Sequence, residues 1–329
     1  MVGLTPTPYP LSSNPYPLIS VIIPNWNGAA HLPTCLDSLR RQTYPRFEVI
    51  VVDNGSTDNS LQLLERDYPE VRVVALPRNR GFAGGANAGI RQAQGEIIAV
   101  FNNDAQADPR WLEELAGALA RHPEAGMATP KVLLFDRREV IHTAGDFYRV
   151  DGVPGNRGVW QRDEGQFDRE EYVFGAAGVA AAYRRAMLEE IGLFDEDFFA
   201  FCEDVDLAWR AQLAGWRCIY VPTAVVYHKL SATGGGKIAS YYCGRNFIYV
   251  IAKDYPTSLL RRYWRRIIAA QLSIAWEALR AWRGEAARAR LRGQLAGLWG
   301  LPRMLRKRHA IQRARKVSDE YLEFILTGC

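Results

Sequence analysis

One stretch, Glu96-Ile97-Ile98-Ala99-Val100-Phe101-Asn102-Asn103-Asp104, decides the fold, because an apolar run stops there abruptly on two amides and one carboxylate. Residues 97–101 are β-branched or aromatic except for Ala99 and do not alternate with polar residues, which predicts a strand buried on both faces of a parallel sheet. In open α/β sheets, ligands bind at the carboxyl ends of the strands. Asp104 is therefore placed to hold a cation, although a simple turn is the alternative interpretation of these polar residues.

The composition is that of a globular protein. The chain has 329 residues, of which 48% are hydrophobic and 23% are charged, so it can bury a sizeable core in about two domains. Its five cysteines are scattered without a C-x-x-C pair, which argues against a disulfide framework or a zinc knuckle and favours a reducing compartment. Residues 1–17 contain five prolines and neither Lys nor Arg, so we expect an extended tail and not a signal peptide. No apolar run reaches the roughly 18 residues of a spanning helix, and we expect a cytoplasmic protein.

Three predicted strand–helix units lead up to the strand at residues 97–101. Strands are expected at residues 18–23, 47–53 and 71–76, and helices at 29–42, 60–66 and from the glycine-rich segment 81–89 onward. This alternation predicts an α/β fold with a doubly wound, mostly parallel sheet. The glycine spacing is G-x-x-G-G-x-x-x-G and follows the third strand, which argues against a dinucleotide fingerprint. Glycine at a helix start still lets backbone N–H groups approach a phosphate or a ribose.

Several motifs, taken in order, resemble family 2 glycosyltransferases of the GT-A fold. They are residues 20–27 (SVIIPNWN), 51–58 (VVDNGSTD), 79–87 (NRGFAGGAN) and 101–104 (FNND). Residues 192–199 (GLFDEDFF), 203–210 (EDVDLAWR) and 221–228, which end in Tyr-His, resemble the bacterial rhamnosyltransferase-like branch. The resemblance covers about residues 18–254. It implies an enzyme that transfers a sugar, with rhamnose favoured, from a nucleoside diphosphate sugar to a hydroxyl of a glycan or lipid-linked saccharide in cell-surface polysaccharide synthesis.

The resemblance also implies a donor site. Asp53 is similar to the family residue that accepts the N3–H of a uracil or thymine ring, so a UDP- or dTDP-linked donor is expected. A turn or helix-cap role is the alternative for Asp53. The other residues implied to line the donor site are Pro24, Asn25, Asn27, Asn79, Arg80, Gly81, Asn87, Asn102 and Asn103.

A divalent cation, Mg²⁺ or Mn²⁺, is implied by the same resemblance. Many relatives have Asp-x-Asp where this chain has Asn102-Asn103-Asp104, so only Asp104 remains as a direct carboxylate ligand. His228 ends an apolar run and is similar to a family histidine that completes the metal shell, although a lone histidine at a strand end is more often structural. Lys229 and the glycine loop 233–237 suit a segment that closes over a diphosphate, with a solvated loop as an equal alternative.

Three carboxylates, Glu203, Asp204 and Asp206, open a predicted helix over residues 203–215. Acids in a first helical turn often only complement the helix dipole. Three of them within four positions repel one another, which raises the proton affinity of at least one and favours a general base. The resemblance implies that Asp204 is the catalytic base, while Glu203 and Asp206 position it or bind the acceptor. With one base and no evident nucleophile opposite, an inverting displacement is expected.

The region 255–329 differs in charge from the predicted transferase domain at 18–254. It holds 16 Lys and Arg against 5 Asp and Glu, a net charge of +11 in a chain whose total is +5. Arginines interleaved with tryptophans predict a basic helical extension on an anionic membrane surface, and hence a peripheral protein of the inner face of the cell membrane. Helices packed on the enzyme body are the alternative; no motif supports nucleic-acid binding. A non-catalytic nucleotide-sugar- or membrane-binding protein with a decayed site is the alternative function.

Overall fold

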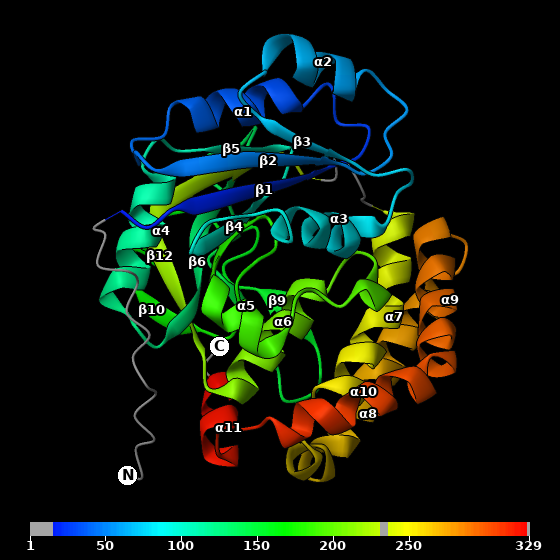
Figure 1. Ribbon diagram of the computed structural model, residues 1–329. Coiled ribbons are helices and arrows are strands. Elements are labelled where there is room, and N and C mark those ends of the chain that lie inside the picture. The colour runs from blue at the N-terminus through cyan, green and yellow to red at the C-terminus, as the bar shows by residue number, and fades with distance from the viewer. Residues whose placement is uncertain (1–15, 231–235, 328–329) are drawn as a thin grey trace.

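Strand β4 (Ile97–Phe101) lies in the middle of a ten-stranded mixed sheet in the computed structural model, which describes residues 16–230 and 236–327 (Figure 1). All five of its residues are buried, as the unbroken apolar run predicts. It pairs in parallel with β1 (Ile19–Asn25) and antiparallel with β11 (Ala180–Arg184). Most of the tail predicted at 1–17 and most of the glycine loop at 233–237 lie outside the described residues.

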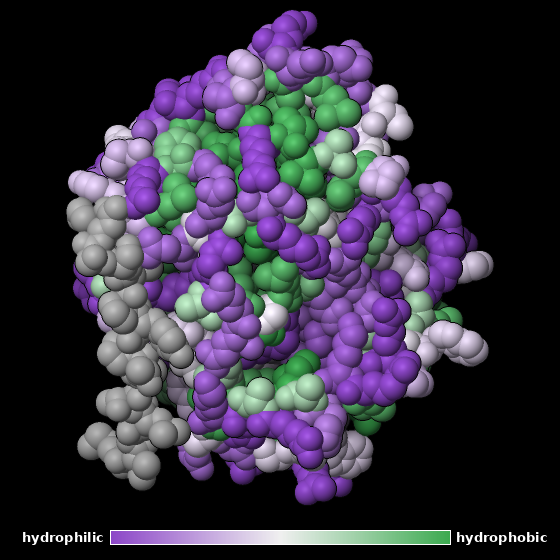
Figure 2. Space-filling model, in the orientation of Figure 1, coloured by the Kyte–Doolittle hydropathy of each residue, from purple (hydrophilic) through white to green (hydrophobic). Residues whose placement is uncertain are grey.

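The strand–helix units that begin the chain form the parallel half of this sheet, in the order β4-β1-β2-β3. Their bounds are β2 (Phe47–Asp53), β3 (Arg72–Ala75), α1 (Leu32–Arg40), α2 (Ser60–Asp67) and α3 (Gly81–Ile90). The doubly wound α/β arrangement is thereby confirmed. β3 is an edge strand, and Figure 2 shows hydrophobic side chains gathered near it below α2, where Leu61 and Val73 are exposed.

The other half of the sheet is built largely by antiparallel pairing. Its elements are β5 (Ala105–Ala107), β6 (Ala125–Leu134), β7 (Ile141–Thr143), β10 (Glu171–Val173), β11 and β12 (Arg217–His228), with α4 (Trp111–Arg121), α5 (Arg185–Ile191) and α6 (Glu203–Ala214) between them. β8 (Asp146–Tyr148) and β9 (Pro154–Asn156) form a separate hairpin. β12 carries an irregularity between Val221 and Val225, next to Pro222, because proline cannot donate to the ladder.

Alternating residues of the central strands enter two different hydrophobic cores. In β1, Val21 and Ile23 pack with α1 and α4 on one face of the sheet, while Ile22 faces α3 and the helices of the other face. β4 divides in the same way, with Phe101 on the first side and Val100 on the second. Both faces of the sheet are therefore covered, and the polar residues that follow the strands are left at its edge.

The C-terminal helices pack beside α6 and do not form a detached tail (Figure 1). They are α7 (Lys237–Lys253), α8 (Thr257–Arg280), α9 (Glu285–Trp299), α10 (Leu301–Arg313) and α11 (Asp319–Thr327). The predicted boundary at 254/255 falls in the turn between α7 and α8, yet Leu259, Met304 and Leu322 belong to the same core cluster as α6. α7 and α9 approach closely at Gly293, where an added Cβ would lie 2.1 Å from the carbonyl oxygen of Tyr241. Within the described ranges, none of these helices has the length and hydropathy of a membrane crossing.

Candidate active site

Asp104 and His228 meet at the end of β4, although 124 residues separate them in the chain. The turn after β4 leads directly into β5, and β5 pairs with β12 so that Ala105 lies opposite His228. His228 Nε2 is consequently 3.1 Å from Asp104 Oδ1, and Asn102 Nδ2 lies 3.5 Å from the same nitrogen. The predicted metal pair is thus brought together by the strand register.

The donor atoms of this pair fit a small divalent cation. Two ligands about 2.1 Å from one octahedral ion, at right angles, are about 3 Å apart, which is the separation of the carboxylate oxygen and the imidazole nitrogen here. Both side chains are buried, so their orientations are fixed before anything binds. In the described part of the chain no cluster of three or more His, Cys, Asp or Glu side chains is arranged for a metal. The pair therefore supplies only part of a coordination shell, as is usual where substrate phosphates supply the rest.

His142, which no sequence motif singled out, contacts the ring of His228 on the side away from Asp104. The two Nδ1 atoms lie 3.2 Å apart and the rings stack, with centroids separated by 5.0 Å at an interplanar angle of 15°. Burial, and then the neighbouring His228, lower the pKa of His142 to about 4. A neutral ring at position 142 can accept or donate a hydrogen bond. No local signal marks this residue, because it lies in the three-residue strand β7.

A chain of polar contacts joins the ends of β4, β1 and β2. Asn103 Nδ2 donates to Asn25 Oδ1 at 2.7 Å, and Asn25 Nδ2 lies 3.4 Å from Asp53 Oδ1. The parallel register that places Asn25 beside Asp53 makes this contact possible. Asp53 Oδ2 also accepts the backbone N–H of Ser56 at 3.2 Å, so the turn role considered for this residue is present. Gly28 completes the cluster, because a Cβ there would lie 2.1 Å from Asn103 Nδ2.

The remaining predicted donor residues form the rim around this cluster. Asn27 is exposed and its Oδ1 accepts the N–H of Thr57 at 2.7 Å, while Pro24 is half-buried. Asn79 Oδ1 accepts the N–H of Gly81 at 2.7 Å at the start of α3. Arg80 is held by Glu196, with Nη2 and Oε2 2.6 Å apart. This rim lies at the carboxyl edge of the parallel strands, as predicted.

Two residues predicted to bind substrate instead make contacts within the protein. Asn87 is buried, donates to the carbonyl of Phe194 at 2.8 Å and accepts the N–H of the same residue at 3.1 Å, so it ties α3 to the segment before α6. Asp206 has no exposed surface and pairs with Arg210 and Lys253. Burial acts to raise the pKa of Asp206, but Lys253 and Arg210 outweigh it and hold that pKa below the usual value. We therefore assign structural roles to both residues and no substrate contact.

Asp204 is half-buried in the first turn of α6, with both carboxylate oxygens oriented by backbone donors. Gly178 N–H donates to Oδ2 at 2.9 Å and Val205 N–H to Oδ1 at 2.8 Å. Burial raises the pKa of Asp204 above the ordinary value because a desolvated carboxylate is costly, and the backbone donors offset part of this rise. A carboxylate with raised proton affinity and fixed orientation can take a proton from a bound hydroxyl.

Glu203 differs from its neighbour in being almost completely buried. Burial, followed by the charge of Asp204, raises the pKa of Glu203 well above the usual value, which favours the protonated form of this carboxyl group. Among the described residues its Oε2 has no hydrogen-bond partner. A neutral acid beside a carboxylate can donate a hydrogen bond to a ligand while the carboxylate accepts one.

The segment before these acids has unusual backbone geometry. Phe199, Phe201 and Cys202 all have left-handed φ angles, of 64°, 66° and 65°, which non-glycine residues seldom adopt. The buried amide Nδ2 of Asn246, in α7, lies 2.5–3.1 Å from the carbonyl oxygens of Phe198, Ala200 and Phe201. α7 therefore holds the turn that presents the acids. Nothing in the sequence singled out Asn246 or predicted the left-handed φ angles before the acids.

The carboxylate of Asp204 and the metal pair are linked through two consecutive residues of one backbone segment. Gly178 N–H bonds to Asp204, and the carbonyl of the next residue, Val179, accepts the N–H of Asn102 at 2.9 Å. The carboxylate of Asp204 and the Asp104–His228 pair thus border the same edge of the sheet.

Known proteins that are similar to this chain include sugar transferases. An L-rhamnosyltransferase of Mycobacterium tuberculosis H37Rv, named for N-acetylglucosaminyl-diphospho-decaprenol, is 29% identical over 280 residues, which cover 78% of this chain and 91% of that protein. The O-antigen biosynthesis protein RfbC of Myxococcus xanthus is 34% identical over 236 residues, which cover 68% of this chain but 18% of RfbC. The mannosyltransferase PcManGT of Pyrobaculum calidifontis, solved with GDP-Man and Mn²⁺, has a TM-score of 0.54 at 21% identity and covers 95% of this chain and 79% of that one, which supports the fold.

The model of glycosyl transferase family 2 matches residues 20–192, which is just over half of the chain. That span contains β1, β2, β4 and the Asn102-Asn103-Asp104 turn, where the polar strand ends were found. On this match, and with a GT-A-like α/β sheet, the chain belongs to glycosyl transferase family 2.

Proposed function

We propose that this glycosyltransferase moves a sugar from a nucleoside diphosphate sugar to a hydroxyl of a lipid-linked saccharide or glycan, with inversion at the anomeric carbon. The observation that carries the proposal is the placement of Asp204 and the Asp104–His228 pair on either side of the segment Gly178-Val179. A transferase needs positive charge at the leaving diphosphate and a base at the acceptor. Asp204 would serve as the base, and a cation held by Asp104 and His228 would supply the positive charge.

Asp104 and His228 would hold a divalent cation, Mg²⁺ or Mn²⁺. Such an ion, when bound, supplies the positive charge that stabilises a departing diphosphate. Asn102, which stands where many relatives have an acid, contributes an amide near the same nitrogen and lowers the negative charge of the protein shell. PcManGT, a neighbour in fold, was solved with GDP-Man and Mn²⁺, which supports the proposal of a divalent cation.

Asp204 is proposed as the general base. Its carboxylate accepts the proton of the acceptor hydroxyl, whose oxygen then forms a bond to the anomeric carbon as the bond from that carbon to the diphosphate oxygen breaks. Glu203, whose Oε2 has no partner in the described structure, is proposed to hydrogen-bond the acceptor sugar. Because attack and departure occur on opposite faces of the ring, the product has the inverted configuration.

The choice of donor rests on Asp53 and on the relatives. Asp53 lies at the end of β2 in the donor cluster, where a carboxylate can accept the N3–H of uracil or thymine, which supports a UDP- or dTDP-linked sugar. The mycobacterial relative is named as an L-rhamnosyltransferase that uses a diphospho-decaprenol acceptor, and RfbC is named for O-antigen biosynthesis. We therefore propose rhamnose as the sugar and a lipid-linked saccharide of cell-surface polysaccharide synthesis as the acceptor.

A panel of nucleotide sugars, tested by thermal shift with and without Mn²⁺, tests this proposal first. We expect a dTDP- or UDP-sugar to raise the melting temperature, Mn²⁺ to increase that shift, and Asp104→Ala to remove the increase. Asp136→Asn, an exposed acid outside the site, is the control and should behave as the wild type. Metal-independent donor binding would contradict the cation assignment. Binding without hydrolysis or transfer of any donor would favour the alternative of a decayed, non-catalytic site.

A further inference from the structure

Helix α8 presents a row of large hydrophobic side chains to the outside. Its members are between 49% and 63% exposed and follow one another at helical spacing: Trp264, Ile268, Leu272, Trp276 and Leu279. Residues three or four apart lie on one face of a helix, so these five form a continuous stripe. A monomeric protein rarely exposes so many large apolar groups together without a use for them.

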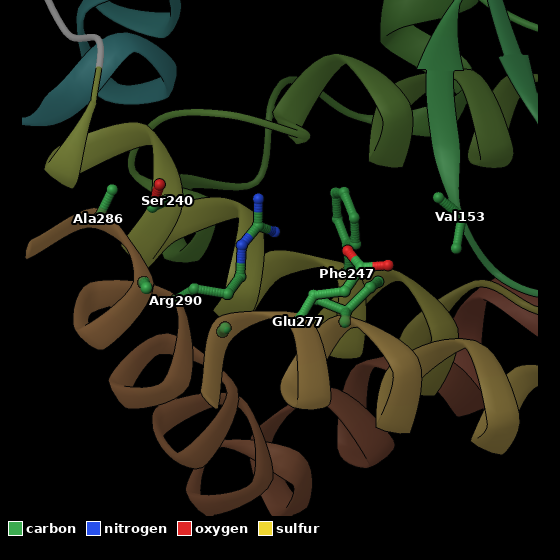
Figure 3. A pocket seen from close by; sticks show the side chains of 9 residues that line it. Val153, Ser240, Phe247, Glu277, Ala286 and Arg290 are labelled. Atoms are coloured by element: carbon green, nitrogen blue, oxygen red, sulfur yellow. The ribbon is translucent and has the colours of Figure 1, made fainter. Parts of the chain in front are cut away.

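The stripe is not required to hold α8 in place. A different side of the helix carries the buried residues Leu259, Ile267 and Ala278. There, Ile274, Glu277 and Ala278 also line a hollow of about 360 Å³ that α8 shares with α7 and α9 (Figure 3). The buried side of α8 therefore packs against the rest of the protein, and the stripe remains uncovered within the described structure.

Basic residues of the C-terminal helices divide into two groups. One group is engaged in ion pairs with acidic side chains: Arg303 with Asp197, Lys307 with Asp195 and Asp197, Arg262 with Glu323, Arg315 with Asp319 and Lys316 with Glu190. The other group is exposed beside the stripe. Arg261 and Arg265 are exposed on the same face of α8, and within the described residues neither forms a salt bridge.

The arginines and tryptophans of this face are closely associated. The guanidinium carbon of Arg265 lies 5.4 Å from the centroid of the Trp264 ring. The end of α9 adds another exposed group, Leu295, Leu298 and Trp299, the last of which is 90% exposed. Tryptophan and arginine on one helix face, with leucine and isoleucine between them, are the residues that enter the headgroup region of a bilayer.

We propose that the outward face of α8 docks this enzyme on an anionic lipid bilayer, with the stripe inserted at the headgroup level and Arg261 and Arg265 bound to lipid phosphates. A second copy of the chain is a poorer occupant, because symmetric pairing of this face would bring two strongly basic segments together. Docking through this face of α8 does not depend on the chemistry at Asp204. It would bring an enzyme to acceptors held in a membrane.

Co-sedimentation of the full chain with phosphatidylcholine vesicles, with and without phosphatidylglycerol, tests the proposal. Trp264→Ser/Trp276→Ser should weaken the partition coefficient at least about tenfold, because insertion of the aromatic stripe is lost. Arg261→Gln/Arg265→Gln should lose more than about tenfold on anionic vesicles and little on neutral ones. Added salt should weaken binding of the wild type to anionic vesicles.

Matched controls lie elsewhere on the surface. Trp160→Ser removes a tryptophan that is 60% exposed on the catalytic body, and Arg66→Gln removes an exposed arginine of α2; both should bind vesicles as the wild type does. Circular dichroism and melting temperature establish that each variant is folded. Unchanged vesicle binding by the tryptophan variant would overturn the proposal. So would light scattering that shows a dimer broken by the same substitutions, since the stripe would then be an interface between copies.

Discussion

His142 Nδ1 lies 3.2 Å from His228 Nδ1, so one imidazole is held by another on the side away from Asp104. Two imidazole nitrogens share such a contact only if one donates and the other accepts. If His228 held a cation through Nε2, its Nδ1 would carry the proton and donate it to His142. His142 would then orient the ring of His228, as hydrogen-bond partners of metal-binding histidines usually do.

Replacing His142 with phenylalanine should weaken Mn²⁺ binding to the nucleotide complex about 10–100-fold, because the ring of His228 loses the acceptor that orients it. Isothermal titration with Mn²⁺ in the presence of UDP measures this. His122→Phe, which removes a histidine bonded to Tyr172 far from the site, is the control. An unchanged Mn²⁺ affinity in His142→Phe would show that His228 does not need its neighbour.

Lys253 should be critical for stability, because it is buried between Asp195 and Asp206. Lys253→Met removes the cation shared by the buried Asp206 and the partly buried Asp195, which keep only Arg210 and Lys307, at a cost of up to about 3–5 kcal/mol in the free energy of unfolding. Burial acts to raise the pKa of Asp195, but Lys253 and Lys307 outweigh it and hold that pKa well below its usual value. Denaturant unfolding measures the loss. The exposed pair Lys316–Glu190 is the control, and Lys316→Met should cost less than about 1 kcal/mol.

The same lowered pKa sets the direction of a pH effect. A carboxylate whose pKa is lower in the folded state than in the unfolded state contributes stability above the unfolded value, and this stability is lost as the pH falls through the folded value. The wild type should therefore lose stability on acidification below about pH 4. Lys253→Met should lose less over that range, because the shift depends on the lysine. Equal acid sensitivity of the two proteins would contradict the assignment.

Asn246→Ala should slow turnover without weakening donor binding. The substitution removes the contacts that hold the carbonyls of Phe198, Ala200 and Phe201, so the left-handed turn before the acids can relax. We expect a stability loss of about 1–3 kcal/mol together with a lower kcat. Steady-state kinetics and the donor Kd measure the effect, with the exposed Asn59→Ala as control. A normal kcat would mean that the geometry of the turn does not matter to the chemistry.

The pH dependence of kcat offers a further check. Burial raises the pKa of Asp204, and a base acts only when deprotonated, so the rate should fall on the acid side at a pH above the value of about 3.9 for an ordinary aspartate. A profile of kcat against pH at saturating substrates locates this limb. A limb at or below the ordinary value would show that Asp204 is not desolvated in the working enzyme.

Residues that end long apolar runs were the predictable part of this site. Asp53 and His228 end strands and Asp104 follows one, and each of these strands can be recognised from its run of apolar residues. The parallel order of the first strands brings their carboxyl ends to one edge of the sheet. The acidic first turn of α6 could also be predicted from the sequence, because Glu203 and Asp204 are adjacent at the start of a helix.

Residues whose roles depend on distant partners could not be predicted. Asp206 looks like its acidic neighbours in sequence, but it lies two residues after Asp204, about 200° further around the helix, and so points at Lys253, 47 residues away. Asn87 follows a glycine-rich helix start and yet bonds to Phe194, 107 residues further on. The antiparallel β11, inserted beside β4, arises from long-range pairing that no local pattern encodes.

The assignment of Asp204 as the base is the central claim, and the kcat of Asp204→Asn beside its donor Kd tests it most directly. Asparagine keeps the shape and can still accept the N–H of Gly178, but it cannot take up a proton. We expect kcat to fall about 10²–10⁴-fold, the usual contribution of a general base, while the donor Kd stays near that of the wild type. A kcat close to that of the wild type would contradict the claim, and a product with retained anomeric configuration would exclude direct displacement.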